Sequence, residues 1–289
     1  MLVSVITHRG LDPSRAPYFF ESSVEAFSDQ LDRGYGLEFD LRITKDNKIV
    51  VIHDDSLKRI SKGKDTREIR SLTADEILAM DFDGSHIATL DHLLHLIETR
   101  QREDAVSAMH LKIGSQGKDD LDIILSCLQE ANPKKFYIFD TTIPTAAYLK
   151  EKNPNLRIAP SVAHPHDIKR YNDVVGGTLF SVEEVLAQRA LFDGVWLDEW
   201  DLIDKNGGIK KCYTQETIDT LRNAGLWVGL VTPELHGTSP GLLGGEAHAD
   251  AKSFEVLALR FQEIIALKPD AMCTDYPDYV QNLINKVQM

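Results

Sequence analysis

The chain has 289 residues, of which 43% are hydrophobic and 27% are charged, a composition typical of a globular protein long enough to bury one large core. No apolar run approaches the roughly 20 residues that a membrane-spanning helix requires. The 45 acidic residues outnumber the 32 basic ones and give a formal net charge of −13, which argues against nucleic acid and against stable membrane association.

Short runs rich in Val, Ile, Leu and Phe alternate with helical patterns along the chain, which indicates repeated strand–helix units. We predict strands at 2–8, 36–41, 49–53, 106–113, 135–140, 157–162, 194–199, 227–232 and 271–274. We predict helices at 21–34, 74–80, 90–101, 118–131, 143–152, 181–191, 214–224 and 253–267. Thr73 and Thr214 are expected to cap two of these helices, and residues 41–49 leave room only for a turn.

Eight strands that alternate with helices in a chain of this length predict an α/β fold of the (β/α)8 TIM-barrel type. The pattern contains nine strands, so one of them is misassigned or lies outside the barrel wall. Nothing divides the chain into halves, and we expect residues 1–289 to form a single domain. A Gly-rich insertion at about 233–253 is expected to be a lid or specificity loop. Its possible ligands are expected to be solvated instead: Glu234, His236, Glu246 and His248.

Cysteine usage and the start of the chain both bear on where the protein works. Cys127, Cys212 and Cys273 are widely spaced without a metal-ligand pattern, so we expect them to be reduced. The first strand begins almost at Met1 and leaves no room for a cleaved leader if His8 is functional. A cytoplasmic location is therefore expected.

Charged and titratable residues stand at the ends of the first predicted strands. Glu38 and Asp40 are two residues apart on a strand, so their side chains point to the same face. Two such carboxylates repel each other unless a cation or a shared proton relieves them, and Mg²⁺ and Ca²⁺ prefer oxygen ligands of this kind. His8 and His53 each follow an apolar strand and could serve as general acid and general base. In a barrel all four residues are expected to face one mouth.

Three more residues could extend this group. Arg9 offers a planar fork suited to a phosphate, or an ion pair with Glu21. His110 and Lys112 share one face of a later strand, and a lysine inside a barrel needs an anion, which here would be the phosphate or the carboxylates. His110 would either bind the metal, which would favour Mn²⁺, Co²⁺ or Zn²⁺ relative to Mg²⁺, or only form a hydrogen bond with a carboxylate.

These residues belong to a set of motifs that occur in a fixed order. They are "HRG" at 8–10, "GLEFD" at 36–40, "VVIHDDSLKR" at 50–59, "HLK" at 110–112 and "CTDYP" at 273–277. In this order the chain resembles the glycerophosphodiester phosphodiesterase family, densely from residue 3 to about 112 and again at 271–277. Two positions depart from the family pattern. His110 replaces a usual glutamate, and "LVTPE" at 230–234 replaces a usual Trp-Thr-Val-Asn.

The resemblance implies a fold, an activity and a set of roles. It implies a barrel in which His8 and His53 are the acid–base pair, and in which the phosphate is held by Arg9 and Lys112. It implies one divalent cation, Mg²⁺ or Ca²⁺, with Mn²⁺ possible because of His110; the cation's expected ligands are Glu38, Asp40 and His110. The implied reaction converts a small phosphodiester substrate to glycerol 3-phosphate and an alcohol.

Two other functions are compatible with the same motifs. Sphingomyelinase D-like phospholipases resemble the chain in the same order of histidine, acidic pair and histidine, but "PYFF" at 17–20 is its only conspicuous aromatic tip. The acidic balance and the lack of paired cysteines argue against that function. A non-catalytic barrel that binds a phosphorylated ligand is favoured by the replaced glutamate at 110 and opposed by the two histidines.

Overall fold

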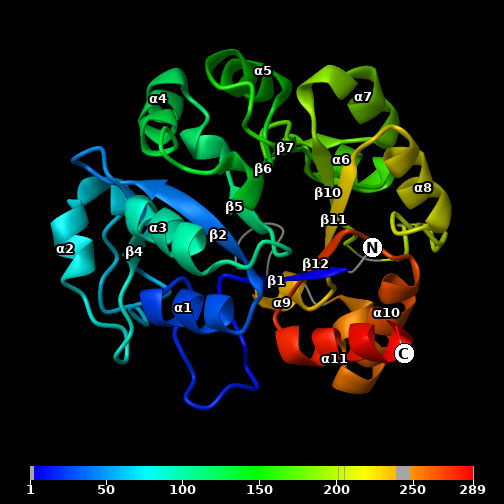
Figure 1. Ribbon diagram of the computed structural model, residues 1–289, viewed down its shortest axis with the longest axis horizontal. Helices are drawn as coiled ribbons and strands as arrows, with labels where there is room; N and C mark the ends of the chain where they lie inside the picture. The colour runs from blue at the N-terminus through cyan, green and yellow to red at the C-terminus, as the bar shows by residue number, and fades with distance from the viewer. Residues whose placement is uncertain (1–2, 201, 205, 239–247, 289) are drawn as a thin grey trace.

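The computed structural model describes residues 3–200, 202–204, 206–238 and 248–288, and its centre is a curled parallel sheet surrounded by helices (Figure 1). The barrel strands in these ranges are β1 (Ser4–His8), β2 (Gly36–Ile43), β5 (Ser107–His110), β6 (Phe136–Phe139), β7 and β8 (Ile158–Ala159 and Ser161–Val162), β10 (Gly194–Leu197), β11 (Trp227–Val231) and β12 (Ala271–Thr274). Each strand pairs in parallel with the next, and β12 pairs with β1. The expected TIM-barrel-like fold is confirmed.

Pro160 divides the fifth barrel strand into β7 and β8. Proline has no backbone N–H and cannot donate a hydrogen bond to a neighbouring strand. The Pro160 carbonyl still accepts a hydrogen bond from the N–H of Trp196 at 2.9 Å. Because β7 pairs with β6 and β8 pairs with β10, the ring of strands closes across this segment. The short strand β9 (Leu179–Phe180) also pairs with β8.

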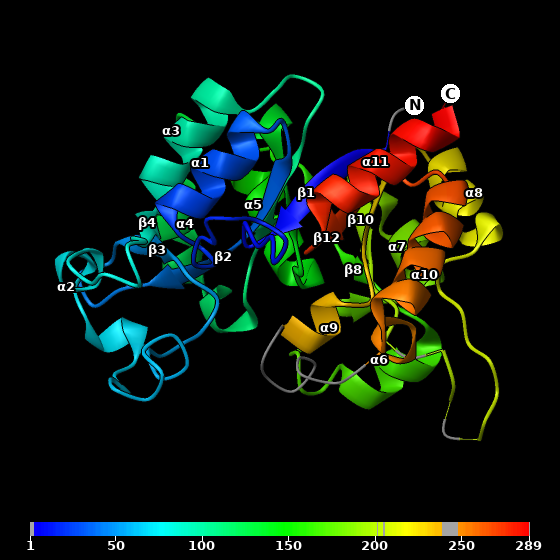
Figure 2. The same cartoon turned by 90° about the horizontal axis from the view of Figure 1, so that it is seen from below.

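Helices cover the outside of the barrel and one of its ends. The outer helices are α1 (Val24–Asp32), α3 (Leu90–Arg100), α4 (Lys118–Cys127), α5 (Ile143–Lys152), α7 (Val182–Ala187), α8 (Gln215–Asn223), α10 (Phe254–Ala266) and α11 (Pro277–Gln288). Shorter helices at the end that carries the C-terminal ends of the strands are α2 (Ala74–Leu78), α6 (Pro165–Tyr171) and α9 (Leu235–Thr238) (Figure 2). Short 3-10 turns lie at Ile69–Ser71, Ile113–Ser115, Pro133–Lys135, Arg189–Leu191 and Ala249–Ala251. The side chains of Thr73 and Thr214 cap α2 and α8 as predicted.

The predicted strand at 49–53 is the one that lies outside the barrel wall. It forms β3 (Ile49–Val51), which runs antiparallel to the outer part of β2 and to β4 (Ala88–Thr89). The reason is the turn at 44–48, which reverses the chain before a helix can form; Thr44 accepts a hydrogen bond from the N–H of Lys48 at 3.0 Å. The ninth predicted strand was therefore real but was not part of the ring.

One long helix and several short elements were not predicted from the sequence. Helix α11 has apolar residues at 280, 283, 284 and 287, which is helical spacing, and it begins with Pro277. That signal was present in the sequence. Helices α6 and α9 and strands β4 and β9 have two to seven residues each, too few for a periodic pattern.

Alternation along β2 separates the hydrophobic core from the barrel interior. Leu37, Phe39 and Leu41 are fully buried in the main core between the sheet and the helices. Glu38 and Asp40 point the other way, into the interior. A smaller core of residues between 50 and 87 stabilises the segment that carries β3 and α2. The sequence therefore directs its carboxylates inward with the same alternation that builds the core.

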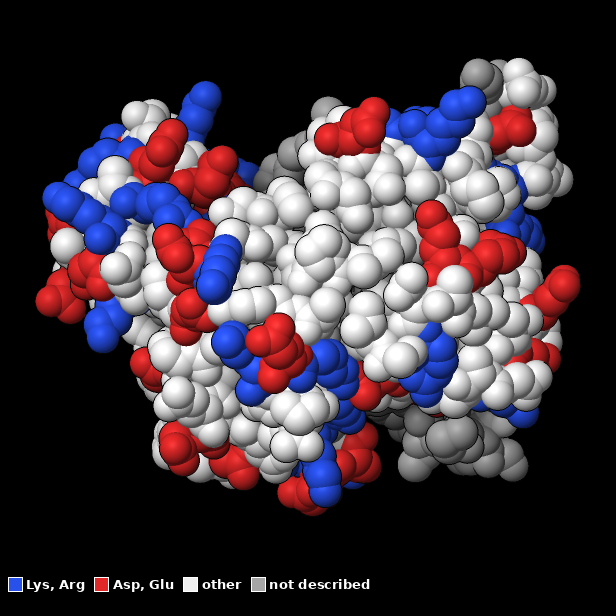
Figure 3. All heavy atoms as spheres, turned by 90° about the horizontal axis from the view of Figure 1, so that it is seen from above, with Lys and Arg blue, Asp and Glu red and all other residues white. Residues whose placement is uncertain are grey.

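The surface charges, the lengths of the helices and the state of the cysteines are consistent with what the composition indicates. On the face drawn in Figure 3, basic and acidic side chains are interspersed and leave a broad uncharged area between them. Every helix in the described ranges is too short or too polar to cross a membrane. Cys212 and Cys273 are buried and Cys127 is partly buried, and none of the three forms a disulfide.

Gly36, at the start of β2, tests how tightly the barrel is packed. A Cβ atom at this position would lie 1.8 Å from the backbone oxygen of Val106, which cannot move without shifting β5. We expect Gly36→Ala to lower the free energy of unfolding by about 3 kcal/mol, measured by urea denaturation. Gly114→Ala is the control, because a Cβ at Gly114 meets nothing within 4 Å. Equal stabilities of the two variants would contradict this packing.

Candidate active site

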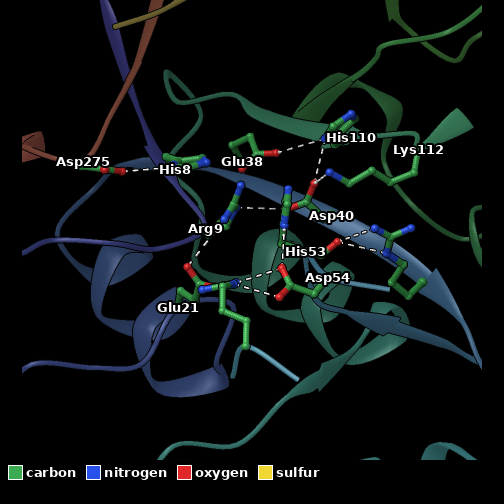
Figure 4. A network of polar contacts seen from close by, with 12 residues as sticks. His8, Arg9, Glu21, Glu38, Asp40, His53, Asp54, His110, Lys112 and Asp275 are labelled. Atoms are coloured by element: carbon green, nitrogen blue, oxygen red, sulfur yellow. Dashed lines mark hydrogen bonds and ion pairs between the residues drawn. The ribbon is translucent and has the colours of Figure 1, made fainter. Parts of the chain in front are cut away.

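The polar residues singled out in the sequence converge at one end of the barrel (Figure 4). They line a cavity of about 390 Å³. The predicted residues that face this cavity are His8, Arg9, Glu38, Asp40, His53, His110 and Lys112. Strand register explains part of the convergence, because His8 is paired with Glu38 and Asp40 is paired with His110 on neighbouring parallel strands.

His53 reaches the cavity although its strand is not part of the barrel. β2 continues beyond the barrel to Ile43, and β3 returns beside it in the opposite direction. The N–H of Ile52 donates to the carbonyl of Asp40 at 3.0 Å, so the chain that follows β3 arrives beside Asp40. The expected convergence of His53 is correct, and its structural reason is a return strand.

Glu38 and Asp40 form a buried pair of carboxylates. Burial, together with the neighbouring Asp40, raises the pKa of Glu38 to about 8. Burial alone would also raise the pKa of Asp40, but the Lys112 ammonium and other nearby cationic groups hold it well below its ordinary value. One carboxylate is therefore ionised and the other keeps its proton at neutral pH, as expected for two close carboxylates without a cation between them.

Three basic side chains contact Asp40. Lys112 Nζ lies 2.8 Å and His110 Nδ1 lies 2.7 Å from Asp40 Oδ1, and Arg9 Nε lies 3.3 Å from Oδ2. Arg9 also lies 3.6 Å from Glu21, so both of its expected interactions, with the anionic site and with Glu21, are compatible with its position. Asp40 is thus the centre of the charged network.

His110 lies between two carboxylates. Its Nδ1 faces Asp40, and its Nε2 lies 3.0 Å from Asp140 Oδ2. Burial lowers the pKa of His110, but the hydrogen bonds with Asp140 and Asp40 outweigh burial and place it above its ordinary value. In this arrangement the ring bridges two acids. If Nε2–H donates to Asp140, Nδ1 remains the atom that could bind a metal.

Each candidate catalytic histidine has its own carboxylate partner. His8 Nδ1 lies 2.9 Å from Asp275, and His53 Nδ1 lies 2.8 Å from Asp54. Such a contact orients the ring and favours the tautomer with hydrogen on Nδ1, which leaves Nε2 for acid–base chemistry. Burial lowers the pKa of His53 to about 3, and burial together with Arg9 holds the pKa of His8 well below its ordinary value. Both rings are therefore neutral at pH 7 before an anion arrives.

A second set of charged side chains contacts the partner of His53 and also contacts Arg9. Arg59 forms hydrogen bonds with Asp54 at 2.8 and 3.0 Å and with Glu21. Glu21 in turn faces Arg9, so the partner of His53 and the candidate phosphate ligand belong to one network (Figure 4). Arg9 has a φ of 54°, a left-handed conformation that is uncommon outside glycine and that recurs at functional sites.

Several carboxylates near the site were not predicted as site residues. Asp54 and Asp275 lie inside motifs already recognised, "VVIHDD" and "CTDYP". Asp140 follows the apolar strand β6 directly, which is the same signal that identified His8. Glu234 accepts hydrogen bonds from the hydroxyls of Thr232 and Thr274, at 2.7 and 2.6 Å, and from the N–H of Asp275 at 3.1 Å. It thereby fixes the backbone that carries the partner of His8.

The expectation that the loop residues are solvated is wrong for three of them. Glu234, His236 and His248 are all buried, and the two imidazole rings stack with their centroids 5.5 Å apart. The reason is that the flanks of the insertion fold inward as α9 and the turn at Ala249–Ala251. Glu246, with the rest of 239–247, lies outside the described residues.

The donor atoms fit a divalent cation. One ligand atom each from Glu38, Asp40 and His110 can be chosen so that all three lie within 4.8 Å of one another. Glu38 Oε2 and Asp40 Oδ2 are buried and accept no hydrogen bond within the described part of the chain. Buried carboxylate oxygens left in this way are suited to Mg²⁺, Ca²⁺ or Mn²⁺. The site is a candidate metal site, and the identity of the metal stays open.

A family comparison and a sequence relative agree with this site. The model of the glycerophosphoryl diester phosphodiesterase family matches residues 8–279. A glycerophosphodiester phosphodiesterase of Caldanaerobacter subterraneus subsp. tengcongensis is 34% identical over 106 residues, which cover 34% of this chain and 41% of that protein. The chain therefore matches only about two fifths of the length of this curated relative.

Solved structures share the fold over the whole chain. A proposed glycerophosphodiester phosphodiesterase from Galdieria sulphuraria superposes with a TM-score of 0.70 at 19% identity, covering 99% of this chain and 98% of that one. A phosphodiesterase from Oleispira antarctica, solved with the product sn-glycerol-3-phosphate, gives a TM-score of 0.64 at 17% identity, covering 98% and 97%. At such identities the likeness concerns the fold.

Replacement of His110 by glutamate tests whether the imidazole binds the metal. If Nδ1 is a ligand, we expect His110→Glu to raise the ratio of Mg²⁺ to Mn²⁺ affinity on the order of tenfold, because a hard oxygen replaces a nitrogen. Isothermal titration of both ions into wild type and variant measures the ratio. His95→Glu, on the exposed side of α3, is the control. An unchanged ratio would leave His110 as a hydrogen-bonding residue only.

Metal affinity should also depend on pH through Glu38. The carboxyl holds a proton below about pH 8 in the metal-free site, and a metal must displace that proton. Affinity should therefore rise with pH from 6 to 8, by about tenfold per unit for one proton released, and level off above pH 8. Mn²⁺ titrations in buffers of different ionisation enthalpy measure both affinity and proton release. Constant affinity over this range would show that Glu38 is already ionised.

Proposed function

The chain belongs to the glycerophosphoryl diester phosphodiesterase family, and from this premise we propose that it hydrolyses glycerophosphodiesters to glycerol 3-phosphate and an alcohol. The observation that carries the proposal is the pair of histidines, each anchored through Nδ1 to a carboxylate, that face one cavity with two buried acids. The related phosphodiesterase from Oleispira antarctica was solved with sn-glycerol-3-phosphate, which supports the product.

Arg9 and Lys112 are proposed to hold the phosphate. Both line the cavity, and both contact Asp40, so the side chains are already positioned before substrate binds. The negative charge of an entering phosphate can replace part of the interaction that Arg9 and Lys112 make with Asp40. The arginine fork can bind two phosphate oxygens, and the ammonium adds a point charge.

His8 and His53 are proposed to share the proton transfers. Nε2 of one ring takes the proton from the nucleophile, which is water or the neighbouring glycerol hydroxyl, and the other gives a proton to the leaving alkoxide. A neutral ring can act as the general base without any change. The ring that acts as the general acid must first be protonated, and an anionic substrate nearby favours this because it raises the pKa of the histidine. Asp54 and Asp275 hold the rings in place during both transfers.

The proposed ligands of the divalent cation are Glu38 and Asp40, with His110 as a third ligand or as a neighbour. A cation held there, Mg²⁺ or Ca²⁺ with Mn²⁺ as an alternative, would neutralise charge on the phosphoryl oxygens. Its arrival also resolves the repulsion that keeps a proton on Glu38. A metal held there would thus contribute to charge balance as well as to chemistry.

The proposal also covers the domain organisation, the partner and the location of the protein. We take residues 1–289 to act as a single barrel domain; Leu235 and His236, at the start of the segment 233–253, line the cavity, and 239–247 lies outside the described residues. A small-molecule phosphodiester is the proposed partner, and the cytoplasmic location stays a prediction. Two anchored histidines argue against a barrel that only binds its ligand.

Replacement of the two histidines tests the catalytic assignment. We expect His8→Ala and His53→Ala each to reduce kcat for glycerophosphocholine hydrolysis by about 10² or more, the usual contribution of a general acid or base. Release of glycerol 3-phosphate, coupled to its dehydrogenase, measures the rate. His95→Ala, on the exposed face of α3, should retain wild-type activity. Near wild-type rates in both active-site variants would sink the assignment.

A further inference from the structure

The cavity has two chemically different sides. One side carries the histidines, the carboxylates and the basic residues described above. The other, which we call the apolar wall, consists of Ile113, Val174, Val175, Leu179, Trp200 and Leu235. The roles proposed above use only residues of the polar side, so the apolar wall requires a separate explanation.

The apolar wall begins beside the proposed phosphate site. Ile113 is the next residue after Lys112, whose ammonium contacts Asp40. The segment around Gly176 packs against it, since a Cβ at Gly176 would lie 2.4 Å from Ile113 Cγ1. Leu179 and Trp200 belong to one buried cluster with Val175 packed against it. The wall is therefore supplied by the segments that follow β5, β8 and β10, together with Leu235, which begins α9 after β11.

Two residues of the wall are unusually exposed for aliphatic side chains. Ile113 is 42% exposed and Val174 is 54% exposed, although both line the cavity. Covering apolar surface that is in contact with water contributes about 25 cal/mol of binding free energy per Å². An apolar ligand would recover this energy, and a purely polar one would not.

The carboxylates on this side already have basic partners. Asp198 forms an ion pair with His236 at 3.3 Å, and Asp140 faces His110. Burial lowers the pKa of His236, but Asp198 outweighs burial and raises it above the ordinary value. A cationic head group would therefore have to compete with a histidine for each acid, whereas a hydrocarbon chain has no competitor.

We propose that the apolar wall binds a hydrocarbon chain attached to one of the two alcohols of the phosphodiester, so that the substrate class is a single-chain glycerophosphodiester. The inference rests on the proposed function and narrows its substrate. The overall reaction is unchanged: oxygen from water bonds to phosphorus, one P–O bond to an alcohol breaks, and the hydrogen from water goes to the departing alkoxide. The hydrocarbon chain belongs either to an acyl group on glycerol or to the second alcohol, and the probes below separate these two sources.

Equilibrium binding tests the wall without catalysis. We expect n-alkyl phosphates from methyl to octyl, each below its micellar concentration, to bind about fourfold more tightly per methylene group until the wall is covered. Ile113→Ser and Val174→Ser should each flatten this dependence. Val287→Ser is the control, because Val287 is 63% exposed near the end of α11, on the side of the barrel opposite α6 and α9 (Figure 2). A flat series in the wild type would overturn the inference, whether or not the serine variants fold.

Hydrolysis rates distinguish failure of this inference from failure of the proposed function. The probes are glycerophosphocholine, 1-acyl-glycerophosphocholines of increasing chain length, and glycerophospho-n-alkanols of matched length. An increase of kcat/KM with length in either series supports the wall and identifies the side that carries the chain. Hydrolysis without dependence on length overturns the wall and leaves the proposed function intact.

Two further outcomes are informative. A length-dependent binding series with no hydrolysis of any probe would support the wall and contradict the proposed function. A preference for choline over neutral alcohols of equal size, lost in Asp198→Asn, would identify a cation site at Asp198. That result would overturn the apolar assignment.

Discussion

The buried carboxylates of Glu38 and Asp40 are the constraint on which the rest of the site depends. Two acids on one strand face, inside a barrel, are stable only if their charge is relieved. The chain does this with a proton on Glu38 and with basic side chains around Asp40. Each of those basic groups is therefore held in the cavity, where it can also meet a phosphate. The arrangement of basic groups that suits catalysis therefore follows from the need to neutralise the two carboxylates on this strand.

Strand alternation explains why much of the arrangement of these charged residues could be predicted from the sequence. A two-residue spacing fixes which side chains share a face, so Glu38 with Asp40, and His110 with Lys112, were placed correctly from local pattern alone. The order of the barrel strands was also accessible, because parallel strands that alternate with helices leave few topologies. Sequence periodicity does not report direction, however, and the antiparallel course of β3 became visible only in its pairing with β2.

What could not be predicted are contacts between segments far apart in the chain. Asp275 meets His8 across 267 residues, and no local pattern connects them. Glu234 is a second case, because the hydroxyls that donate hydrogen bonds to it come from the ends of both β11 and β12. The burial of His236 and His248 depends on how the flanks of a long loop fold back, which composition does not determine. Polar loop residues look solvated in a sequence unless their partners are known.

The replacement at position 110 shows how one change in the site is balanced by another. An imidazole in place of the family's usual glutamate removes a negative charge next to Glu38 and Asp40. Asp140, whose left-handed backbone has a φ of 62°, places a carboxylate 3.0 Å from the other nitrogen of the same ring. The site thus keeps three acids, but the third acts through His110 and lies one side chain farther away. A carboxylate in that position orients the ring, so under our proposal an oriented imidazole stands where the family usually has a carboxylate.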